Sequence, residues 1–272
     1  MTRERLALAT LIAGLSLLAA CAAPRPATDS APRTGPPNRL PGDAVPRQEP
    51  RSRYGNGPTY EVWGQKYQVM ASSHGYQERG VASWYGKKFH GRMTSSQEPY
   101  DMYAMTAAHK SLPLPTYVQV RNLKNNKTVV VRVNDRGPFV HNRLIDLSYS
   151  AALKLDMVRD GTSLVEVTAI SYDDPPRSAR REAPVRSVAA PADSSDSIFV
   201  QVGAFGDPTN ARRRYRMLRE SGIDAAFVHE DESTSPPLYR VRIGPIANVL
   251  QYDSIVEDLQ QLGITESHLV TE

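Results

Sequence analysis

Two proline-rich tracts limit where this chain can fold. Residues 22–58 and 173–196 are rich in proline, arginine, serine and alanine and show no apolar periodicity. Such segments bury too little apolar surface to offset the conformational entropy lost on ordering them. They are therefore predicted to be a tether and a linker, which leaves 59–172 and 197–272 as two folded domains of ordinary size. The tether, extended at about 3.1 Å per residue, would reach on the order of 100 Å.

The N-terminus has the features of a secretion signal. Arg3 and Arg5 precede an apolar stretch, 6–18, that is too short for a comfortable membrane span. The stretch leads into "LAAC", which resembles the bacterial lipobox. Residues 1–20 are thus expected to be a lipoprotein signal peptide, with Cys21 acylated and the protein anchored by its lipid. An ordinary signal peptide with an incidental cysteine is the alternative.

The cysteine content and the net charge limit which cellular compartment and which classes of binding partner are expected. Cys21 is the only cysteine, so an intramolecular disulfide is impossible. No aspartate follows it, and by resemblance to the sorting rule of enteric bacteria the outer membrane is favoured, facing the periplasm. Removing residues 1–20 takes away two arginines and one glutamate, so the net charge falls from +4 to about +3. A charge this small does not call for nucleic acid or another polyanion as a partner.

The central block is predicted to be a small closed β-barrel. Residues 116–123 and 127–133 alternate apolar and polar residues around an Asn-rich turn, as a hairpin does. Residues 163–172 form a further strand, and Ser148 is placed to cap a short helix. Many short strands with little helix favour a barrel. Alternation puts three valines of the second strand on one face: Val129, Val131 and Val133.

Four polar residues of this block are candidates for chemistry. Asp135 follows a strand and precedes Gly-Pro, so it is expected at a barrel rim with a fixed orientation, although Asn-Asp and Gly-Pro pairs are also ordinary turn formers. Glu98 lies in a polar loop and could be merely solvated. His109 follows small residues and could be a hydrogen-bonded structural group. Asp146 is better explained as a structural carboxylate bonded to backbone N–H groups or to Arg143.

Other chemistries fit the sequence poorly. The histidines of the block lack the spacing of a metal site and have no cysteine partners, so neither a metal nor another cofactor is expected. No G-x-S-x-G elbow or phosphate-binding glycine loop is present. Carboxylate and imidazole groups on a rigid β scaffold remain, and these are suited to cleaving glycosidic bonds.

The C-terminal block is predicted to have the order βαββαβ. Strands are expected at 197–205, 225–230, 238–246 and 267–270, with helices between them that begin at Pro208 and near Asn248. This order gives a four-stranded sheet with both helices on one side. RNA-binding domains share the plan, but their stacking aromatics are absent here. Alternation buries Val200, Val202, Val241 and Ile243 and leaves an open face that suits sugar hydroxyls and acetamido groups: Phe199, Gln201, Arg240 and Arg242.

The motifs of the central block resemble one family. "ASWYG", "FHGR", "TAAH", "NDRGPF" and "IDLS" occur in the order found in rare lipoprotein A, a family of septal lytic transglycosylases with a six-stranded double-psi β-barrel. "VQVGAF" and "YRVRIGP" resemble the SPOR domain that follows it. The resemblance implies catalytic roles for Asp135, Glu98 and His109. It also implies binding to peptidoglycan glycan strands without stem peptides at the division septum, with divisome proteins as possible partners.

One position departs from that family. Its loop usually reads T-A-x-G-E, whereas this chain has Gln97 before Glu98. Losing the glycine removes easy access to positive φ, which makes the placement of Glu98 the least secure of the three.

The resemblance implies a mechanism and leaves alternatives open. Protonated Asp135 would donate to the oxygen between N-acetylmuramic acid and N-acetylglucosamine, and the muramoyl C6 hydroxyl would attack its own anomeric carbon. Arg136 is expected to face outward or toward the glycan, because a guanidinium near the acid would favour its ionised form. A non-catalytic glycan-binding lipoprotein and a two-carboxylate hydrolase are the competing interpretations.

Overall fold

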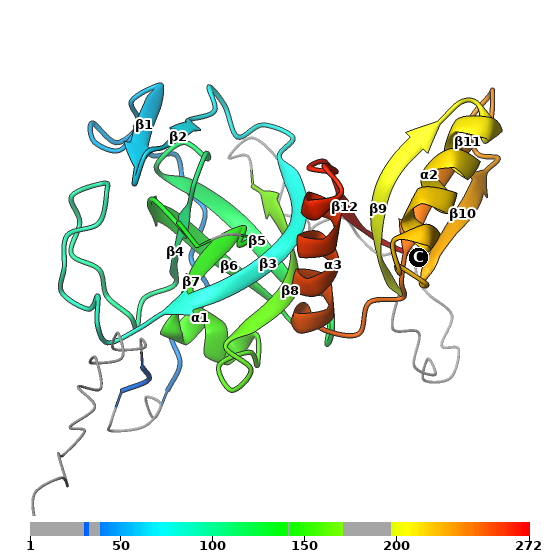
Figure 1. The fold of residues 1–272 in the computed structure, drawn as a ribbon. Coiled ribbons are helices and arrows are strands. Elements are labelled where there is room, and N and C mark those ends of the chain that lie inside the picture. Colours follow the sequence, from blue (N-terminus) through cyan, green and yellow to red (C-terminus); the bar gives the residue numbers. More distant parts are fainter. Residues whose placement is uncertain (1–29, 33–38, 141, 171–196) are drawn as a thin grey trace, which may run out of the picture.

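The computed structural model describes residues 30–32, 39–140, 142–170 and 197–272 (Figure 1). The expected signal peptide, Cys21 and the predicted linker 173–196 lie outside the described residues. Within the described ranges, no helix has the length and apolar character needed to cross a membrane.

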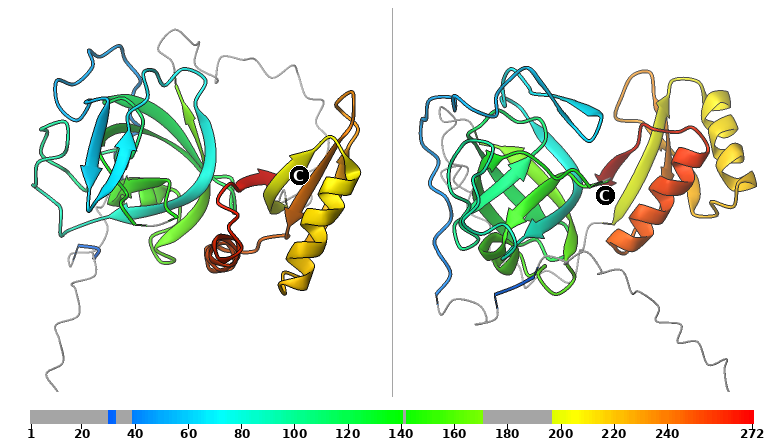
Figure 2. Two further views of the ribbon diagram at one scale, coloured as in Figure 1. Left: turned by 45° about the horizontal axis from the view of Figure 1, so that its top comes forward. Right: turned by 60° about the vertical axis from the view of Figure 1, so that its left-hand side comes forward.

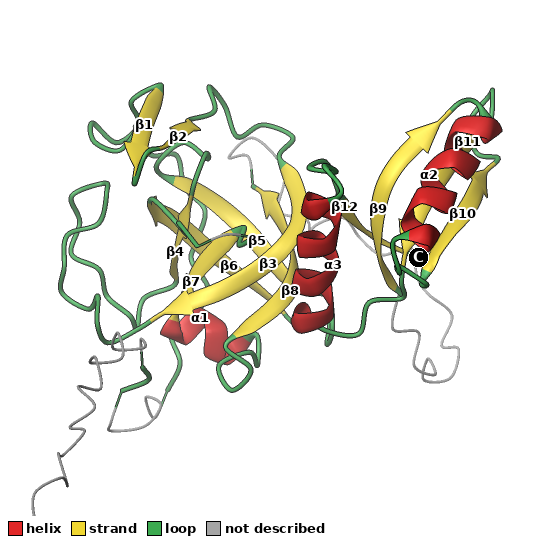
Figure 3. Ribbon diagram, in the orientation of Figure 1, coloured by secondary structure: helices red, strands yellow, loops and turns green. Residues whose placement is uncertain are grey.

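Six strands of the central block close into a barrel, which confirms the predicted double-psi β-barrel (Figure 3). Their order around the barrel is β3-β7-β4-β6-β5-β8. The pairs β3/β7 and β4/β6 are parallel and the others antiparallel. The strands are β3 (Gln77–Tyr85), β4 (Thr106–His109), β5 (Thr116–Asn122), β6 (Thr128–Asp135), β7 (Ile145–Ser148) and β8 (Thr162–Ala169).

Local sequence explains the elements that were predicted. Val129, Val131 and Val133 lie in the barrel core, as the alternation of β6 requires. Ser148 caps helix α1 (Tyr149–Lys154) by accepting a hydrogen bond from the amide of Ala151. Strands β3, β4 and β7 have shorter or less regular apolar patterns, and the sequence did not predict them as strands.

Residues 39–58 form a strap along the barrel, and the prediction of a tether through residue 58 is wrong for this part. The amide of Ala44 donates to Val130 of β6, and the amide of Ser52 donates to Leu114. Asp43 accepts from the amide of Val130 and pairs with Lys154. These hydrogen bonds and the ion pair hold the strap on the barrel, although the strap itself has little apolar surface to bury. A hairpin follows the strap, formed by β1 (Thr59–Val62) and β2 (Gln65–Gln68).

The C-terminal block has the predicted order βαββαβ. Its strands pair antiparallel in the order β10-β11-β9-β12. Side chains of both helices pack in one core with Val200, Val202, Val241 and Ile243, all of which are buried as predicted. The elements are β9 (Ile198–Phe205), α2 (Pro208–Glu220), β10 (Ala226–Asp231), β11 (Leu238–Ile243), α3 (Val249–Gln261) and β12 (His268–Thr271).

Helix α3 lies between the barrel and the C-terminal sheet (Figures 1 and 2). Val81, Leu123 and Leu164 of the barrel belong to the same apolar cluster as the C-terminal core. The carboxylate of Asp253 on α3 accepts two hydrogen bonds of 3.0 Å from the Arg143 guanidinium. The two domains therefore share an apolar contact with an ion pair at its edge.

Candidate active site

Asp135 is the last residue of β6 and lies beside Ala108 of β4. Its carboxyl oxygen Oδ1 accepts three hydrogen bonds: from the Ser95 amide at 2.8 Å, the Ser95 hydroxyl at 2.7 Å and the Arg136 amide at 2.7 Å. Within the described residues, every hydrogen bond to this carboxyl group ends on Oδ1. The group is held by one oxygen, which leaves Oδ2 available to a substrate.

Glu98 is brought to the same side by the loop that binds Asp135. Ser95 bonds to Asp135, and three residues later the Glu98 carboxylate accepts from Asn134 Nδ2 at 2.8 Å. Asn134 and Asp135 are consecutive residues of β6, so that strand holds both ends of the loop. The loop closes on itself through the amide of Thr94, which donates to the carbonyl of Glu98 at 2.8 Å.

Gln97 adopts a backbone conformation that glycine reaches more easily. Its φ is +67°, in the left-handed region. The loop therefore has a non-glycine residue at a position that favours glycine, at the cost of local strain.

Because of that strain, Gln97→Gly is expected to raise the free energy of unfolding by up to about 1 kcal/mol. Glycine relieves the strain but also gives the unfolded chain more freedom, which limits the gain. Urea unfolding monitored by circular dichroism measures it. Gln65→Gly, at an exposed strand position, should instead destabilise the protein. A loss of stability in Gln97→Gly would contradict the strained geometry.

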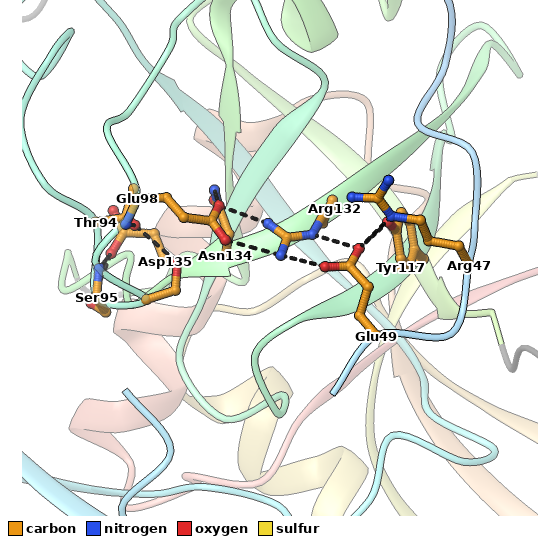
Figure 4. A network of polar contacts seen from close by, with 10 residues as sticks. Arg47, Glu49, Thr94, Ser95, Glu98, Tyr117, Arg132, Asn134 and Asp135 are labelled. Atoms are coloured by element: carbon orange, nitrogen blue, oxygen red, sulfur yellow. Dashed lines mark hydrogen bonds and ion pairs between the residues drawn. The ribbon is translucent and has the colours of Figure 1, made fainter. Parts of the chain in front are cut away.

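Arg132 joins Glu98 to the strap (Figure 4). Its guanidinium makes hydrogen bonds of 2.7 and 3.0 Å with the Glu98 carboxylate and of 2.8 and 3.0 Å with the Glu49 carboxylate. Tyr117 and Arg47 also bond to Glu49. With Arg47 included, two carboxylates and two guanidinium groups give this network no net charge when all four are ionised.

The network keeps both glutamates ionised. Burial by itself would raise the pKa of Glu98, but hydrogen bonds from Arg132 and Asn134 outweigh it and hold the pKa below the ordinary value. The hydrogen bond from Arg132 is the main cause that lowers the pKa of Glu49 to about 2. Glu98 is therefore suited to stabilising positive charge and not to donating a proton.

Glu49→Gln is expected to lower the free energy of unfolding by about 1–3 kcal/mol at neutral pH, since Arg132 loses one of its two anions. The pKa of Glu49 is depressed in the folded state, so its contribution is present above about pH 4.5 and is lost as the pH falls toward 2. Urea titrations at several pH values should show the variant and the wild type converging at low pH. Glu61→Gln, on the exposed face of β1, is the matched control. A constant difference across the range would contradict the assignment.

His109 is not joined to the two carboxylates by a hydrogen bond. In the pairing of β4 with β6, Ala108 lies opposite Asp135. His109 is the next residue of β4, so its side chain points to the other face. Its Nδ1 accepts from the amides of Ser111 and Leu112, and its Nε2 lies 2.8 Å from the Tyr76 hydroxyl. Since Nδ1 is an acceptor, the neutral ring carries its proton on Nε2 and donates it to Tyr76.

Burial, followed by the charges of Arg136 and Lys110, lowers the pKa of His109 to about 3. The side chain lines a cavity of about 660 Å³ between the two domains, which Asp135 and Glu98 do not line. His109 thus stays neutral at physiological pH, and its contacts shape the loop after β4.

The wild type is expected to lose stability as the pH falls from 6.5 toward 4, by up to about 1.4 kcal/mol per pH unit from this one group. The unfolded chain binds a proton near the ordinary histidine pKa, whereas the folded chain does not. His109→Asn keeps an acceptor for the two amides and removes the titration, so its stability should fall less steeply over this range. His74→Asn, at an exposed position, should leave the slope unchanged. Urea unfolding at half-unit pH steps measures the slopes, and equal slopes in wild type and His109→Asn would contradict the buried neutral ring.

Arg136 points inward, so the expectation that it faces outward or toward the glycan is wrong. Its guanidinium donates to the carbonyls of Leu112 at 2.6 Å, His109 at 3.1 Å and Gly55 at 2.7 and 2.9 Å. Only 9% of the residue is exposed. It fastens the strap to the loop after β4, and its guanidinium donates to carbonyl groups of these two segments.

Asp146 lies on the other side of Ala108 from Asp135. Its carboxylate accepts from the Ser83 hydroxyl. The expected partner Arg143 instead bonds to Asp253. Among the described residues, no three His, Cys, Asp or Glu side chains converge on a metal-sized site.

The open face of the C-terminal sheet is more tightly paired than predicted. Phe199 packs edge-on against Phe227, and Arg240 bonds to Asp231 at 2.7 and 2.8 Å. Arg242 is only 7% exposed and bonds to Glu272 and to Gln201. A ligand on this face would therefore meet guanidinium groups that already have acidic partners.

Sequence analysis missed several residues that position the carboxylates. Arg132 and Asn134 are two residues apart on β6, so alternation could have placed both on one face and pointed to a shared partner. Ser95, Glu49 and the inward Arg136 gave no comparable signal, because their partners are distant in the chain.

Comparison with known proteins gives the same division of the chain. Residues 77–167 match the family model described as lytic transglycolase, and residues 194–269 match the SPOR domain. Proteins named endolytic peptidoglycan transglycosylase RlpA are similar over most of the length. The one from Vibrio cholerae is 36% identical, covering 94% of this chain and 93% of the relative. The one from Neisseria meningitidis serogroup A is 44% identical, covering 76% and 80%.

The matches cover both the barrel and the SPOR domain, in the order in which these domains occur in the chain. Both domains matched by the family models are present as folded units, and the relatives align across both. The chain belongs to the RlpA family.

Proposed function

We propose that this protein is an endolytic lytic transglycosylase that cleaves peptidoglycan glycan strands lacking stem peptides. The supporting observation is the asymmetric anchoring of Asp135, whose Oδ1 receives all three donors while Oδ2 is left for the substrate. The relatives are named endolytic peptidoglycan transglycosylases, which supports the reaction class. Catalytic roles for Asp135 and Glu98 and a positioning role for His109 are part of the proposal.

In the reaction, Oδ2 of protonated Asp135 donates its proton to the glycosidic oxygen between N-acetylmuramic acid and N-acetylglucosamine. The bond from the anomeric carbon to that oxygen breaks, and N-acetylglucosamine leaves with the proton. The C6 hydroxyl of the muramic acid attacks the anomeric carbon and passes its own proton to the Asp135 carboxylate, which restores the acid and gives a 1,6-anhydro end. The anionic Glu98 stabilises the positive charge that develops on the sugar.

Mass spectrometry of stem-free glycans digested by the purified protein tests this reaction. Lytic transglycosylation gives ends that are 18 Da lighter than hydrolysed ones, roughly the mass of one water, because the C6 hydroxyl takes the place of water. Ordinary reducing ends would identify a two-carboxylate hydrolase. Binding without any new ends would identify a glycan-binding lipoprotein.

The C-terminal domain is proposed to hold the enzyme on the same glycan at the division septum, through Phe199, Gln201, Arg240 and Arg242. Arg240 and Arg242 have acidic partners, whereas Phe199 and Gln201 are half-buried and carry no ion pair. Sedimentation with purified sacculi tests this assignment. Phe199→Ala with Gln201→Ala should leave more protein in the supernatant, whereas unchanged sedimentation would reject the face.

Anchoring by acylated Cys21, in the outer membrane and facing the periplasm, belongs to the same proposal. Intact-protein mass spectrometry of the membrane fraction should find the acyl chains on Cys21. An unmodified cysteine would reject the anchor. Septal enrichment, and with it the possibility of divisome partners, is tested by imaging a fluorescent fusion in dividing cells.

A further inference from the structure

Trp63 occupies a position that does not suit it. It forms the two-residue tip of the β1–β2 hairpin with Gly64, and the φ angles of the two residues are +51° and +80°. A turn with both residues in the left-handed region favours Asn or Asp followed by Gly. A bulky aromatic residue there is strained, and 87% of Trp63 is exposed. Neither the turn nor the apolar core accounts for this residue.

Trp63 contacts one ring, Phe139, which in turn contacts two tyrosines. Phe139 meets Trp63 edge-on, with ring centroids 6.2 Å apart, and contacts Tyr60 at 6.2 Å and Tyr67 at 5.5 Å. Tyr60 and Tyr67 are stacked at 5.2 Å. The four rings of Tyr60, Trp63, Tyr67 and Phe139 are called the aromatic platform below.

The platform is fixed to the barrel. The Tyr60 hydroxyl donates to the carbonyl of Lys110 at 2.8 Å, and the Arg136 guanidinium lies 5.8 Å from the centre of the Tyr60 ring. The Tyr60 ring is therefore held in place before any ligand arrives, and Phe139 packs against it, which lowers the entropic cost of binding there.

The platform lies close to the proposed catalytic acid. Phe139 follows Asp135 by four residues, a chain length that spans at most about 14 Å. The same residues, 135–139, thus carry the acid at one end and a platform ring at the other. A polymer that presents a bond to Asp135 would extend across neighbouring surface.

We propose that Trp63 and Phe139 form a sugar-binding subsite for the glycan strand, next to the bond that Asp135 cleaves. The inference rests on the proposed function. Sugar rings have apolar faces that pack on aromatic rings, while their hydroxyl groups stay in water at the ring edges. The occupant is a stretch of the same stem-free glycan, held by stacking of its sugar faces on the rings and not by ion pairs. A contact with the ligand explains why a strained, exposed tryptophan occupies a turn position where the fold alone favours Asn or Asp.

Tryptophan fluorescence can report on this subsite directly. The chain has two tryptophans, Trp63 and Trp84, and none in 197–272. Trp84 packs against Tyr149 in the barrel. In full-length protein carrying Asp135→Asn, which should bind without cleaving, stem-free glycan oligosaccharides should shift the emission to shorter wavelength and reduce quenching by acrylamide. Glycan bound only to the C-terminal domain would leave both signals unchanged.

Trp63→Asn is the decisive variant, because Asn-Gly is the preferred sequence for this turn and the hairpin should remain folded. We expect the variant to lose the fluorescence response and to bind the oligosaccharides about tenfold more weakly. In the otherwise wild-type enzyme the same change should raise KM with little change in kcat. Trp84→Phe should keep the response.

The outcomes separate this subsite from the proposed function. If the wild type makes anhydro ends while Trp63→Asn has an unchanged KM and the emission does not move, the subsite is overturned and the enzyme stands. If the wild type makes no new ends and Asp135→Asn binds no glycan, the proposed function fails and the subsite with it. Emission that moves with phospholipid vesicles but not with glycan would assign the platform to a membrane surface and overturn the subsite.

Discussion

Replacing Asp135 with asparagine should lower the rate of glycan cleavage by about 10²- to 10⁴-fold, the usual contribution of a general acid. The amide oxygen can still accept the hydrogen bonds from Ser95 and Arg136 that now end on Oδ1. The amide nitrogen takes the place of Oδ2 and cannot act as an acid. Glycan binding and the free energy of unfolding should change little. The measurement is the initial rate of anhydro-end formation at saturating glycan.

Asp160→Asn is the matched control, since Asp160 lies on the barrel surface and pairs with Lys124 and Arg159. It should retain full activity. If Asp135→Asn kept more than about a tenth of the wild-type rate, the proton would have to come from another group, because general acid catalysis contributes at least about 10²-fold.

Replacing Arg136 with methionine should have the largest effect on stability, a loss of about 3–5 kcal/mol. Methionine fills much of the space but leaves the carbonyls of Gly55, His109 and Leu112 without this donor. A buried acceptor without a donor costs about 1–3 kcal/mol, so several such groups add to a large loss. Equilibrium urea unfolding measures it.

Two further variants make the Arg136 result specific. Arg136→Lys keeps the charge, but a single ammonium group cannot reach carbonyls on both the strap and the loop after β4, so an intermediate loss is expected. Arg159→Met changes a side chain that is 94% exposed and should shift stability by less than about 0.5 kcal/mol. A stable Arg136→Met protein would show that the strap is held by its other contacts.

Arg136 also shows where sequence reasoning stops. Its three carbonyl partners are 24, 27 and 81 residues away in the chain. Local rules describe periodicity, caps and turns, and they succeeded for the valines of β6 and for Ser148. They carry no information on which backbone carbonyls a barrel brings to one point, so an arginine next to a candidate acid was predicted to turn outward.

The candidate site divides in the same way. The motifs identified Asp135 and Glu98. In the structure, Asp135 lies at the end of β6 and Glu98 lies on the loop that bonds to that strand end. Ser95 and Asn134, which hold them, are ordinary polar residues whose importance appears only when the loop folds onto β6. His109 was grouped with the carboxylates by resemblance, whereas its hydrogen bonds connect it to Tyr76 and to the backbone of its own loop.

The strap was misassigned because its composition was considered alone. Glu49 and Gly55 become ordered by contact with Arg132 and Arg136, two cations of the barrel that need partners from outside it. A segment with little apolar surface can therefore be ordered when charged groups elsewhere supply the interaction.

If Cys21 is acylated as proposed, docking of the strap also sets how far the barrel can reach from the bilayer. The strap first bonds to the barrel at Asp43, but farther upstream the carbonyl of Ser30 already accepts a hydrogen bond of 3.1 Å from the amide of Lys87. The chain from Cys21 to Asp43 spans at most about 75 Å, and the chain from Cys21 to Ser30 spans at most about 30 Å while the Ser30 bond is kept. The distance that the barrel can reach from the bilayer is then set by how many N-terminal residues are bound to it, and releasing Ser30, Asp43 and Glu49 would increase that distance.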